Sequence, residues 1–286
     1  MYIFLNDRII PASEAKVSVY DHGFLYGDGI YETVRAYKGT VFMLARHLGR
    51  LGRSASLIRL RLPEGRFIED AVHETLAANG LSEAYVRITL SRGEGPIGLD
   101  PELCGDPTFV VIAERFREYP AACYEKGMKI VFAQTRRNLR DAIDPRIKSL
   151  NFLNNILAKI EAKDRGADEA VMLNSQGFLT EGTVCNIFFV GHGVLCTPSV
   201  DAGILDGITR DIVIGLAKRE GVKVEEGMFR PNDLLRAEEV FFTNTTAEVM
   251  PVGLAEGVAF EVGKITRTLR TLYREEVEAY MRDHGK

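Results

Sequence analysis

Lys148 is a residue whose type and position are suited to catalysis. It stands just before NFLNNILAKIEA, a segment whose apolar residues recur at helical spacing. A lysine there can be a flanking residue that extends its amine to water. It can also be an amine held in a pocket with a lowered pKa, ready to form a Schiff base. We expect one face of the helix to pack inward, made of Leu150, Leu153, Ile156, Leu157 and Ile160.

Two other segments offer backbone groups suited to an anion. In ILDGITRDIV, Gly207 and Ile208 lead into Thr209 at the predicted start of a helix, where N–H groups and the helix dipole favour negative charge. Thr209 could equally be a plain N-cap. In FFTNTTAEV, Thr245 and Thr246 follow an apolar strand with hydroxyls and free amides, although an ordinary strand exit has the same appearance.

Two charged side chains complete the set of candidates. Arg50 lies in HLGRLGR, where arginines at helical spacing usually form a solvated face, but a guanidinium is also the best side chain for a phosphate dianion. Glu181, in TEGTVCN, is by itself typical of a surface turn. A lysine for an imine, an acid for a pyridine nitrogen, an arginine and two anion-binding corners are together what pyridoxal phosphate requires.

Composition and the absence of other motifs narrow the alternatives. The 286 residues are 46% hydrophobic and 27% charged, with a net charge of −4 and no basic tract, which gives no reason to expect nucleic acid or an anionic membrane. No dinucleotide or P-loop fingerprint occurs. The four cysteines lack a C-x-x-C pair, and the five histidines lack H-E-x-x-H, so we expect neither a metal nor a disulfide framework. No apolar run approaches a membrane span of about 20 residues. Because a signal-peptide pattern is also missing, we expect a cytoplasmic protein.

Short strands and helices alternate along the whole chain and must position these groups. GIYETVRAYKGTVFML predicts a hairpin that turns at Lys38-Gly39. In the strand AYVRITLSRG alternate residues share a face, so Tyr85 and Arg87 point the same way.

The order of the elements predicts an α+β fold with two domains. Few strand–helix–strand crossovers recur at regular length, so a Rossmann sheet or a (β/α)8 barrel fits poorly. We expect a smaller α/β domain over residues 1–118, an interdomain loop over 119–128, and a larger C-terminal domain over 129–286.

Six blocks of the chain together resemble the fold-type IV, pyridoxal-phosphate-dependent aminotransferases. This family includes branched-chain and D-amino acid aminotransferases and aminodeoxychorismate lyase. The blocks occur in the family's order: DHGFLYGDGIYETVRAY, HLGRLGRSA, IKSLNFLNNILAKIEA, TEGTVCNIFFV, GILDGITRD and NTTAEVMPV. The resemblance implies a C-terminal domain with a barrel-like core, a cofactor between the domains, and a homodimer in which the partner completes each pocket.

The resemblance also implies roles for individual residues. Lys148 would carry the Schiff base to pyridoxal phosphate, and Glu181 would form a salt bridge with its pyridinium nitrogen. The phosphate would be held by Arg50, Gly207, Ile208, Thr209 and Thr245.

Within the family, the chain is most similar to branched-chain aminotransferases that use 2-oxoglutarate. YVR matches their tyrosine-x-arginine strand, which implies that Tyr85 orients the substrate α-carboxylate near the amides of Thr245 and Thr246. Arg87, with Tyr26 of the partner subunit, would meet the side-chain carboxylate of glutamate. GPIGLDP is similar to the inter-subunit loop of the archaeal type.

Two positions depart from the branched-chain pattern. Phe152 stands where those enzymes usually carry a tyrosine whose hydroxyl reaches the cofactor's O3′, and Tyr31 stands where they commonly carry phenylalanine. Losing one hydrogen bond to an ionised oxygen costs about 1.5–3 kcal/mol. Tyr31 is assigned, with the residues above, to the substrate pocket.

Three alternatives remain open. A D-amino acid aminotransferase would carry Tyr31, but the Arg-x-His of that group is missing from RGEGPIGLD. For aminodeoxychorismate lyase, SRGEG and Asn244 are suggestive, but the lyase lacks the paired threonines. A non-catalytic relative that only holds the cofactor is a different class of protein, and the presence of both Lys148 and Glu181 argues against it.

Overall fold

The computed structural model describes residues 1–285, which form two compact units. Unit 1 consists of Met1–Arg117, Ile147–Asn151 and residues 279–285, and unit 2 consists of Glu118–Arg146 and Phe152–Glu278.

This division differs from the predicted one in three places. Residues 279–285 belong to unit 1, although the sequence assigned them to the domain 129–286. The short segment that contains Lys148 packs with unit 1, although the sequence assigned it to the domain 129–286. The predicted loop 119–128 contains the helix α4 (Ala121–Lys126). Local composition predicts where a chain turns, whereas contacts that are distant in sequence decide which unit a short segment joins.

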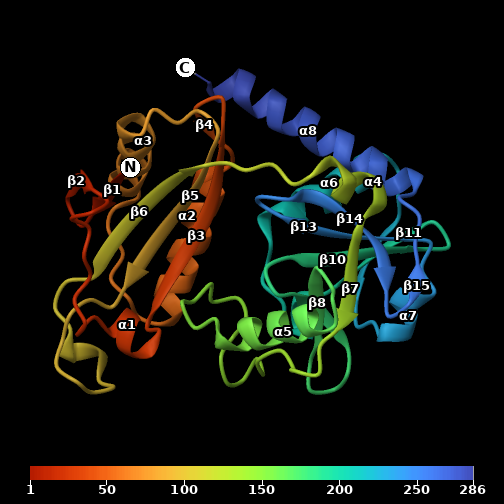
Figure 1. The fold of residues 1–286 in the computed structure, drawn as a ribbon, viewed down its shortest axis with the longest axis horizontal. Helices are drawn as coiled ribbons and strands as arrows, with labels where there is room; N and C mark the ends of the chain where they lie inside the picture. Colours follow the sequence, from red (N-terminus) through yellow and green to blue (C-terminus); the bar gives the residue numbers. More distant parts are fainter. Residues whose placement is uncertain (286) are drawn as a thin grey trace. The chain divides into compact units, whose positions relative to one another are not determined.

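Unit 1 is built on a six-stranded antiparallel sheet with the strand order β2-β1-β6-β5-β3-β4 (Figure 1). The strands are β1 (Tyr2–Leu5), β2 (Arg8–Pro11), β3 (Gly29–Tyr37), β4 (Thr40–Val41), β5 (Ala84–Ser91) and β6 (Thr108–Arg115). Strands β3 and β4 form the predicted hairpin. Lys38 and Gly39 both have positive φ, 50° and 86°, as a type I′ turn requires.

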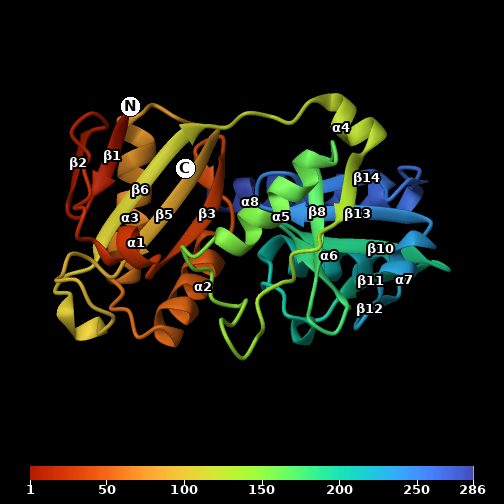
Figure 2. The ribbon, with the colours of Figure 1, turned by 60° about the horizontal axis from the view of Figure 1, so that its bottom comes forward.

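One face of this sheet is apolar and carries the core of unit 1. The helices α2 (Leu44–Leu57) and α3 (Gly65–Ala78) cover it, with α2 beside β3 and α3 beside β1 and β6 (Figure 2). The short helices α1 (His22–Tyr26) and η1 (Pro101–Leu103) lie outside that layer. On β5, residues at alternate positions are buried and half-buried, so the second face is only partly covered.

Unit 2 contains a nine-stranded sheet, six strands of which close on themselves. Its strands are β7 (Met128–Phe132), β8 (Glu169–Leu173), β9 (Leu179–Gly182), β10 (Asn186–Gly191), β11 (Val194–Pro198), β12 (Val224–Gly227), β13 (Glu239–Asn244), β14 (Glu248–Ala255) and β15 (Val258–Ala259). The path β10-β13-β14-β7-β8-β9 returns to β10 through the pair Glu181 and Asn186. The expected barrel-like core and the α+β fold class are therefore confirmed.

The helices of the second part of the chain are α5 (Leu153–Asp164), α6 (Ile208–Arg219), α7 (Pro231–Leu235) and α8 (Lys264–His284), with the turn η2 (Val200–Ala202). Among residues 1–285 no helix has both the length and the apolar character of a membrane span.

Helix α5 faces the opposite way from the prediction. The side chains expected to be buried are exposed: Leu153 by 64%, Ile156 by 50%, Leu157 by 46% and Ile160 by 49%. Leu150, the fifth of them, is half-buried. The helix packs on β8 through its small residues Ala158 and Ala162, because they allow a close approach. Periodicity identified an apolar face correctly but could not identify what covers it.

Candidate active site

Lys148 is tied to unit 1 by its main chain. Its carbonyl accepts a hydrogen bond from the Tyr31 N–H at 2.9 Å, and its own N–H donates to Ser54 Oγ at 3.2 Å. The next residue, Ser149, pairs with Ile30. These bonds to β3 and α2 fix the point from which the lysine side chain extends.

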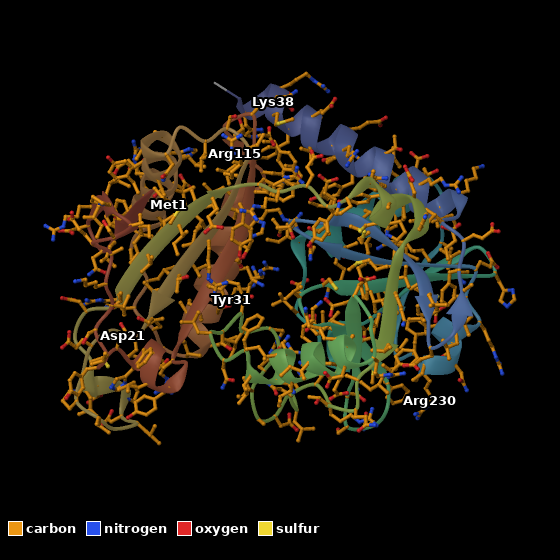
Figure 3. The ribbon with its side chains drawn as sticks, viewed as in Figure 1. Met1, Asp21, Tyr31, Lys38, Arg115 and Arg230 are labelled. Carbon is orange, nitrogen blue, oxygen red and sulfur yellow. The ribbon has the colours of Figure 1, made fainter. Side chains whose placement is uncertain are left out.

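The side chain of Lys148 reaches Tyr31, which lies on β3 (Figure 3). Lys148 Nζ is 3.2 Å from Tyr31 Oη and 4.4 Å from the centre of the ring. The guanidinium carbon of Arg87 is 3.9 Å from the centre of the same ring. Tyr31 is 5% exposed, and its ring contacts the side chains of both Arg87 and Lys148. The face of an aromatic ring attracts such groups electrostatically when they are charged.

Tyr85 and Arg87 share a face of β5, as the strand pattern predicts. In the register of the sheet Arg87 lies opposite Thr33. The Tyr85 hydroxyl is 3.4 Å from Thr33 Oγ1. Because paired residues of neighbouring strands point to the same side, Tyr31 belongs to this face too.

Arg50 is buried rather than solvated, and its partner is a residue that the sequence analysis did not select. Arg50 Nε donates to Glu32 Oε1 at 2.7 Å and Nη2 donates to Glu32 Oε2 at 2.9 Å. His47 Nδ1 lies 2.8 Å from Glu32 Oε2. Arg50, His47 and Glu32 are 4%, 2% and 0% exposed. The available signal was a charged residue at an apolar position of the alternating strand GIYETV.

The pKa values of this cluster follow from its burial and its charges. Burial alone raises the pKa of the Glu32 carboxyl, but Arg50 and His47 together hold it well below its usual range. Burial lowers the pKa of His47 despite the opposing effect of Glu32. The cluster is therefore an ionised carboxylate paired with a guanidinium, beside a neutral imidazole that donates from Nδ1.

Glu181 lies on β9 in unit 2 and is bound through both of its carboxylate oxygens. Arg137 Nε donates to Oε1 at 3.0 Å, and Arg137 Nη2 lies 3.0 Å from the same oxygen. Asn186 Nδ2 and the Leu205 N–H donate to Oε2 at 3.1 and 3.0 Å. Sequence reasoning found Glu181 but missed Arg137 and Asn186, which neither motif nor periodicity marks as its partners.

The loop before α6 passes very close to Asn186. A Cβ atom on Gly207 would lie 2.0 Å from Asn186 Oδ1, so this position requires glycine. Gly207 is also the N-cap of α6, and Thr209 is the second residue of the helix rather than its cap. Ile208 and Thr209 are both buried.

In the turn between β13 and β14, one of the two backbone amides that we expected to be free is hydrogen-bonded. Asn244 Oδ1 accepts hydrogen bonds from the N–H and hydroxyl of Thr246, at 3.0 and 3.1 Å. The Thr246 amide is therefore not free, and the half-buried Thr245 lies beside it. Thr243, one residue before Asn244, is 1% exposed, and its hydroxyl has no hydrogen-bond partner among residues 1–285.

Tyr26, at the end of α1, supports a loop of its own chain. Its hydroxyl accepts the Gly98 N–H at 3.1 Å. In that loop Ile97 and Leu99 are 75% and 84% exposed.

The described contacts thus form two clusters, each within one unit. Unit 1 holds Lys148, Tyr31, Tyr85, Arg87 and Arg50. Unit 2 holds Glu181, Gly207, Ile208, Thr209, Thr245 and Thr246. Within residues 1–285 no group of three His, Cys, Asp or Glu side chains is arranged to hold a metal ion.

Comparison with known proteins identifies the family. The model of the amino-transferase class IV family matches residues 29–254. The chain belongs to this family. A protein of Methanocaldococcus jannaschii is 45% identical over 279 residues, covering 96% of both chains, and is named as a branched-chain-amino-acid aminotransferase, with the name marking that activity as unproven.

The solved structure of one relative contains a form of the cofactor, and another relative has a different activity. A branched-chain amino acid aminotransferase from T.th., complexed with N-(5′-phosphopyridoxyl)-L-glutamate, has a TM-score of 0.91 and 32% identity, over 97% of this chain and 94% of that one. D-alanine aminotransferase of Listeria innocua is 35% identical over 285 residues, covering 97% and 96%. The protein is a pyridoxal-phosphate-dependent aminotransferase of fold type IV.

Proposed function

We propose that this aminotransferase transfers the amino group between a branched-chain L-amino acid and 2-oxoglutarate, giving a 2-oxo acid and L-glutamate by a ping-pong mechanism. The observation that carries the proposal is Arg87, whose guanidinium lies on the ring of Tyr31, the residue that contacts Lys148. One pocket must accept both an apolar side chain and a carboxylate. An arginine that can rest on an aromatic ring or meet an acid supplies both surfaces.

The residues fit pyridoxal phosphate. They include a half-buried amine at Lys148, a buried carboxylate at Glu181 and a buried guanidinium at Arg50. The buried Thr243 hydroxyl, which lacks a partner among residues 1–285, lies directly across from Asn186 in the sheet, and Asn186 lies across from Glu181. The phosphate-binding residues in the proposal are Arg50, Gly207, Ile208, Thr209 and Thr245.

When bound, the cofactor supplies an aldehyde that joins amines and a ring that withdraws electrons from the α-carbon of the amino acid. Lys148 Nζ is the proposed base and accepts the proton from that carbon. Tyr31 Oη, 3.2 Å away, orients the amine with its hydroxyl. Glu181 would hold the pyridinium nitrogen, and Arg137 would then share or release Oε1.

Tyr31 also bears on the hydroxyl missing at Phe152. Phe152 caps the N-terminus of α5 and has no hydroxyl to offer. The hydroxyl that contacts the Lys148 amine is that of Tyr31. We propose that Tyr31 takes over part of the polar role usually assigned to a tyrosine at position 152, and that Tyr85 orients the substrate α-carboxylate with the paired threonines 245 and 246.

A D-amino acid aminotransferase is the second candidate. It is supported by the tyrosine at position 31 and by the similarity to the Listeria innocua enzyme. The two candidates differ in the chirality of the donor, so a half-reaction with L- and D-amino acids separates them directly.

A homodimer is the proposed assembly. The apolar face of α5, made of Leu153, Ile156, Leu157 and Ile160, is at least 46% exposed at every position. Four neighbouring apolar side chains on one helix face mark an interaction surface. A second copy is the occupant we propose, because the exposed Ile97 and Leu99 lie in the loop that resembles an inter-subunit loop. Replacing Ile156 and Leu157 with lysine should give a monomer by light scattering; an unchanged dimer would contradict this surface.

The cytoplasm is the proposed compartment. All four cysteines are free, two of them half-buried and two buried, as a reducing environment allows.

The substrate proposal is tested with Arg87→Met. Loss of the guanidinium should raise the KM for 2-oxoglutarate about 10- to 100-fold, because a buried carboxylate loses its charged partner, while the KM for L-leucine changes little. Arg115→Met is the matched control, because Arg115 lies exposed at the end of β6 (Figure 3). Equal changes in both KM values would contradict the role of Arg87.

A further inference from the structure

Glu32 is a buried ionised group that the chemistry above does not use. It lies on the apolar side of β3, directly opposite Ile88, and is 0% exposed. Its neighbours on that side of the strand, Ile30 and Val34, are also fully buried. A carboxylate in such a place requires charged or hydrogen-bonding partners, because burial penalises its ionised form.

Both partners of Glu32 come from one turn of α2. The Arg50 guanidinium binds one carboxylate oxygen with Nε and the other with Nη2, at 2.7 and 2.9 Å. His47, three residues earlier on the same helix face, contacts Glu32 Oε2 at 2.8 Å. A two-point contact fixes the plane of the guanidinium, which a single hydrogen bond cannot do.

The same helix face leads to Lys148. Ser54 lies four residues after Arg50, one turn along α2, and its hydroxyl accepts the hydrogen bond of the Lys148 main chain. The positive charge of Lys148 also contributes to lowering the pKa of His47. The buried cluster and the reactive amine are therefore close neighbours within unit 1.

We infer that Glu32 and His47 are positioning residues that hold the Arg50 guanidinium in one orientation for the phosphate of the cofactor. The inference rests on the proposed role of Arg50 as a phosphate ligand. A free arginine side chain has many rotamers, and ordering them opposes binding. The contact with Glu32 orders the guanidinium before the phosphate arrives, and the N–H groups outside the fork then point in a fixed direction.

Pyridoxal distinguishes a role at the phosphate from a purely structural role. It has the ring and the aldehyde of pyridoxal phosphate but lacks the phosphate. If Glu32 acts through Arg50 on the phosphate, changing Glu32 weakens the binding of pyridoxal phosphate and leaves the binding of pyridoxal unaffected. If Glu32 only stabilises unit 1, the binding of both ligands weakens together.

The test measures the dissociation constants of both ligands for the apoprotein by the absorbance change on binding. Glu32→Asp keeps the negative charge but is one methylene shorter, so it cannot reach Arg50 with both oxygens. We expect the Kd of pyridoxal phosphate to rise about tenfold, the effect of one lost charge-assisted hydrogen bond. The Kd of pyridoxal should stay within about twofold, because its binding does not involve the guanidinium. Glu239→Asp is the matched control, because Glu239 is also buried and binds Thr266 in unit 2.

His47 provides a milder variant that keeps the Arg50 fork intact. His47→Leu removes the donor to Glu32 and should raise the Kd of pyridoxal phosphate about threefold, whereas His47→Asn, which keeps an N–H donor near the position of Nδ1, should restore it. If Glu32→Asp lowers the affinity for both ligands equally, or lowers neither affinity, the inference is overturned.

Arg50→Gln separates this inference from the proposal on which it rests. If Arg50→Gln weakens pyridoxal phosphate selectively but Glu32→Asp does not, the positioning role alone is wrong. If Arg50→Gln itself leaves the ratio of the two Kd values unchanged, Arg50 is not a phosphate ligand and both statements fall.

Discussion

Glu32 and Glu181 are two buried glutamates on strands, each held by an arginine, and they are held in different ways. Arg50 spans both oxygens of Glu32, and both partners of Glu32 come from α2. Arg137 places Nε and Nη2 at the same oxygen of Glu181, each at 3.0 Å. The other oxygen is bound by Asn186 and the main chain of Leu205, from two further segments.

The difference separates a residue that acts through a neighbour from one that can act on a ligand. Glu32 is enclosed by the core of unit 1, and we expect it to influence a ligand through Arg50. Glu181 depends on three segments that meet only when the strands of unit 2 close, and 7% of its side chain is exposed. We therefore expect substitutions at the two carboxylates to have opposite signatures in stability and in catalysis.

The largest difference should appear in stability. Arg50→Met leaves the fully buried Glu32 without its charged partner and should lower the free energy of unfolding by about 3–5 kcal/mol. Arg137→Met leaves Glu181 with two other donors and should cost about 1–3 kcal/mol. Urea unfolding of both variants measures this, and equal losses would show that the two carboxylates are equivalent.

In catalysis we expect the larger effect at Glu181, the reverse of the order in stability. Glu181→Gln should lower kcat about 100-fold, because a neutral amide no longer stabilises the charge on the ring. Its ratio of pyridoxal phosphate to pyridoxal affinity should stay unchanged, in contrast to Glu32→Asp. Steady-state kinetics of the folded variant measures the effect; a kcat close to that of the wild type would remove Glu181 from the site.

Tyr31 allows a finer separation inside unit 1. Tyr31→Phe keeps the ring beneath Arg87 but removes the hydroxyl at Lys148 Nζ, so kcat should fall about tenfold for every donor. The KM for 2-oxoglutarate should remain constant. A rise confined to that KM would mean that the hydroxyl serves Arg87 and not Lys148.

The smallest effect concerns pH. Because the pKa of His47 in the folded protein is below the ordinary value of 6.5, the unfolded chain takes up this proton first as pH falls. The contribution of His47 to stability is complete above pH 6.5 and is lost as pH falls through the folded-state pKa. Glu32, whose pKa is also lowered, adds a second loss below its ordinary value of 4.5.

His47 faces Glu32, Arg50 and Lys148, and His47→Asn removes only the first of these losses. Denaturant titrations at about pH 7 and about pH 5 should show a smaller drop in stability for His47→Asn than for the wild type, by under about 1 kcal/mol. A larger drop in the variant would mean that the His47 pKa is raised in the folded protein.

Several parts of the fold follow from local sequence alone. The Lys38-Gly39 turn and the shared face of Tyr85 and Arg87 depend on backbone geometry and strand alternation, and both are present. The barrel-like core was expected from the resemblance, because no local pattern reports that β9 returns to β10.

Other parts could not be predicted, for physical reasons. Glu32 is marked in the sequence only as a charge at an apolar strand position. Its partners Arg50 and His47 could not be predicted, because they are set by the packing of α2 on β3. The apolar face of α5 was recognised, but periodicity does not say whether the same chain or a second copy covers it. The helix instead packs through Ala158 and Ala162, which carry little apolar signal.

The central claim is that this aminotransferase uses L-leucine-like donors and L-glutamate in one pocket, and a half-reaction tests it most directly. The yellow holoenzyme is mixed separately with L-leucine, L-glutamate, D-alanine and D-glutamate, and its cofactor absorbance is followed as pyridoxamine phosphate forms. Bleaching by the two L-amino acids alone is the predicted result. Bleaching by the D-amino acids alone would contradict the account and identify a D-amino acid aminotransferase.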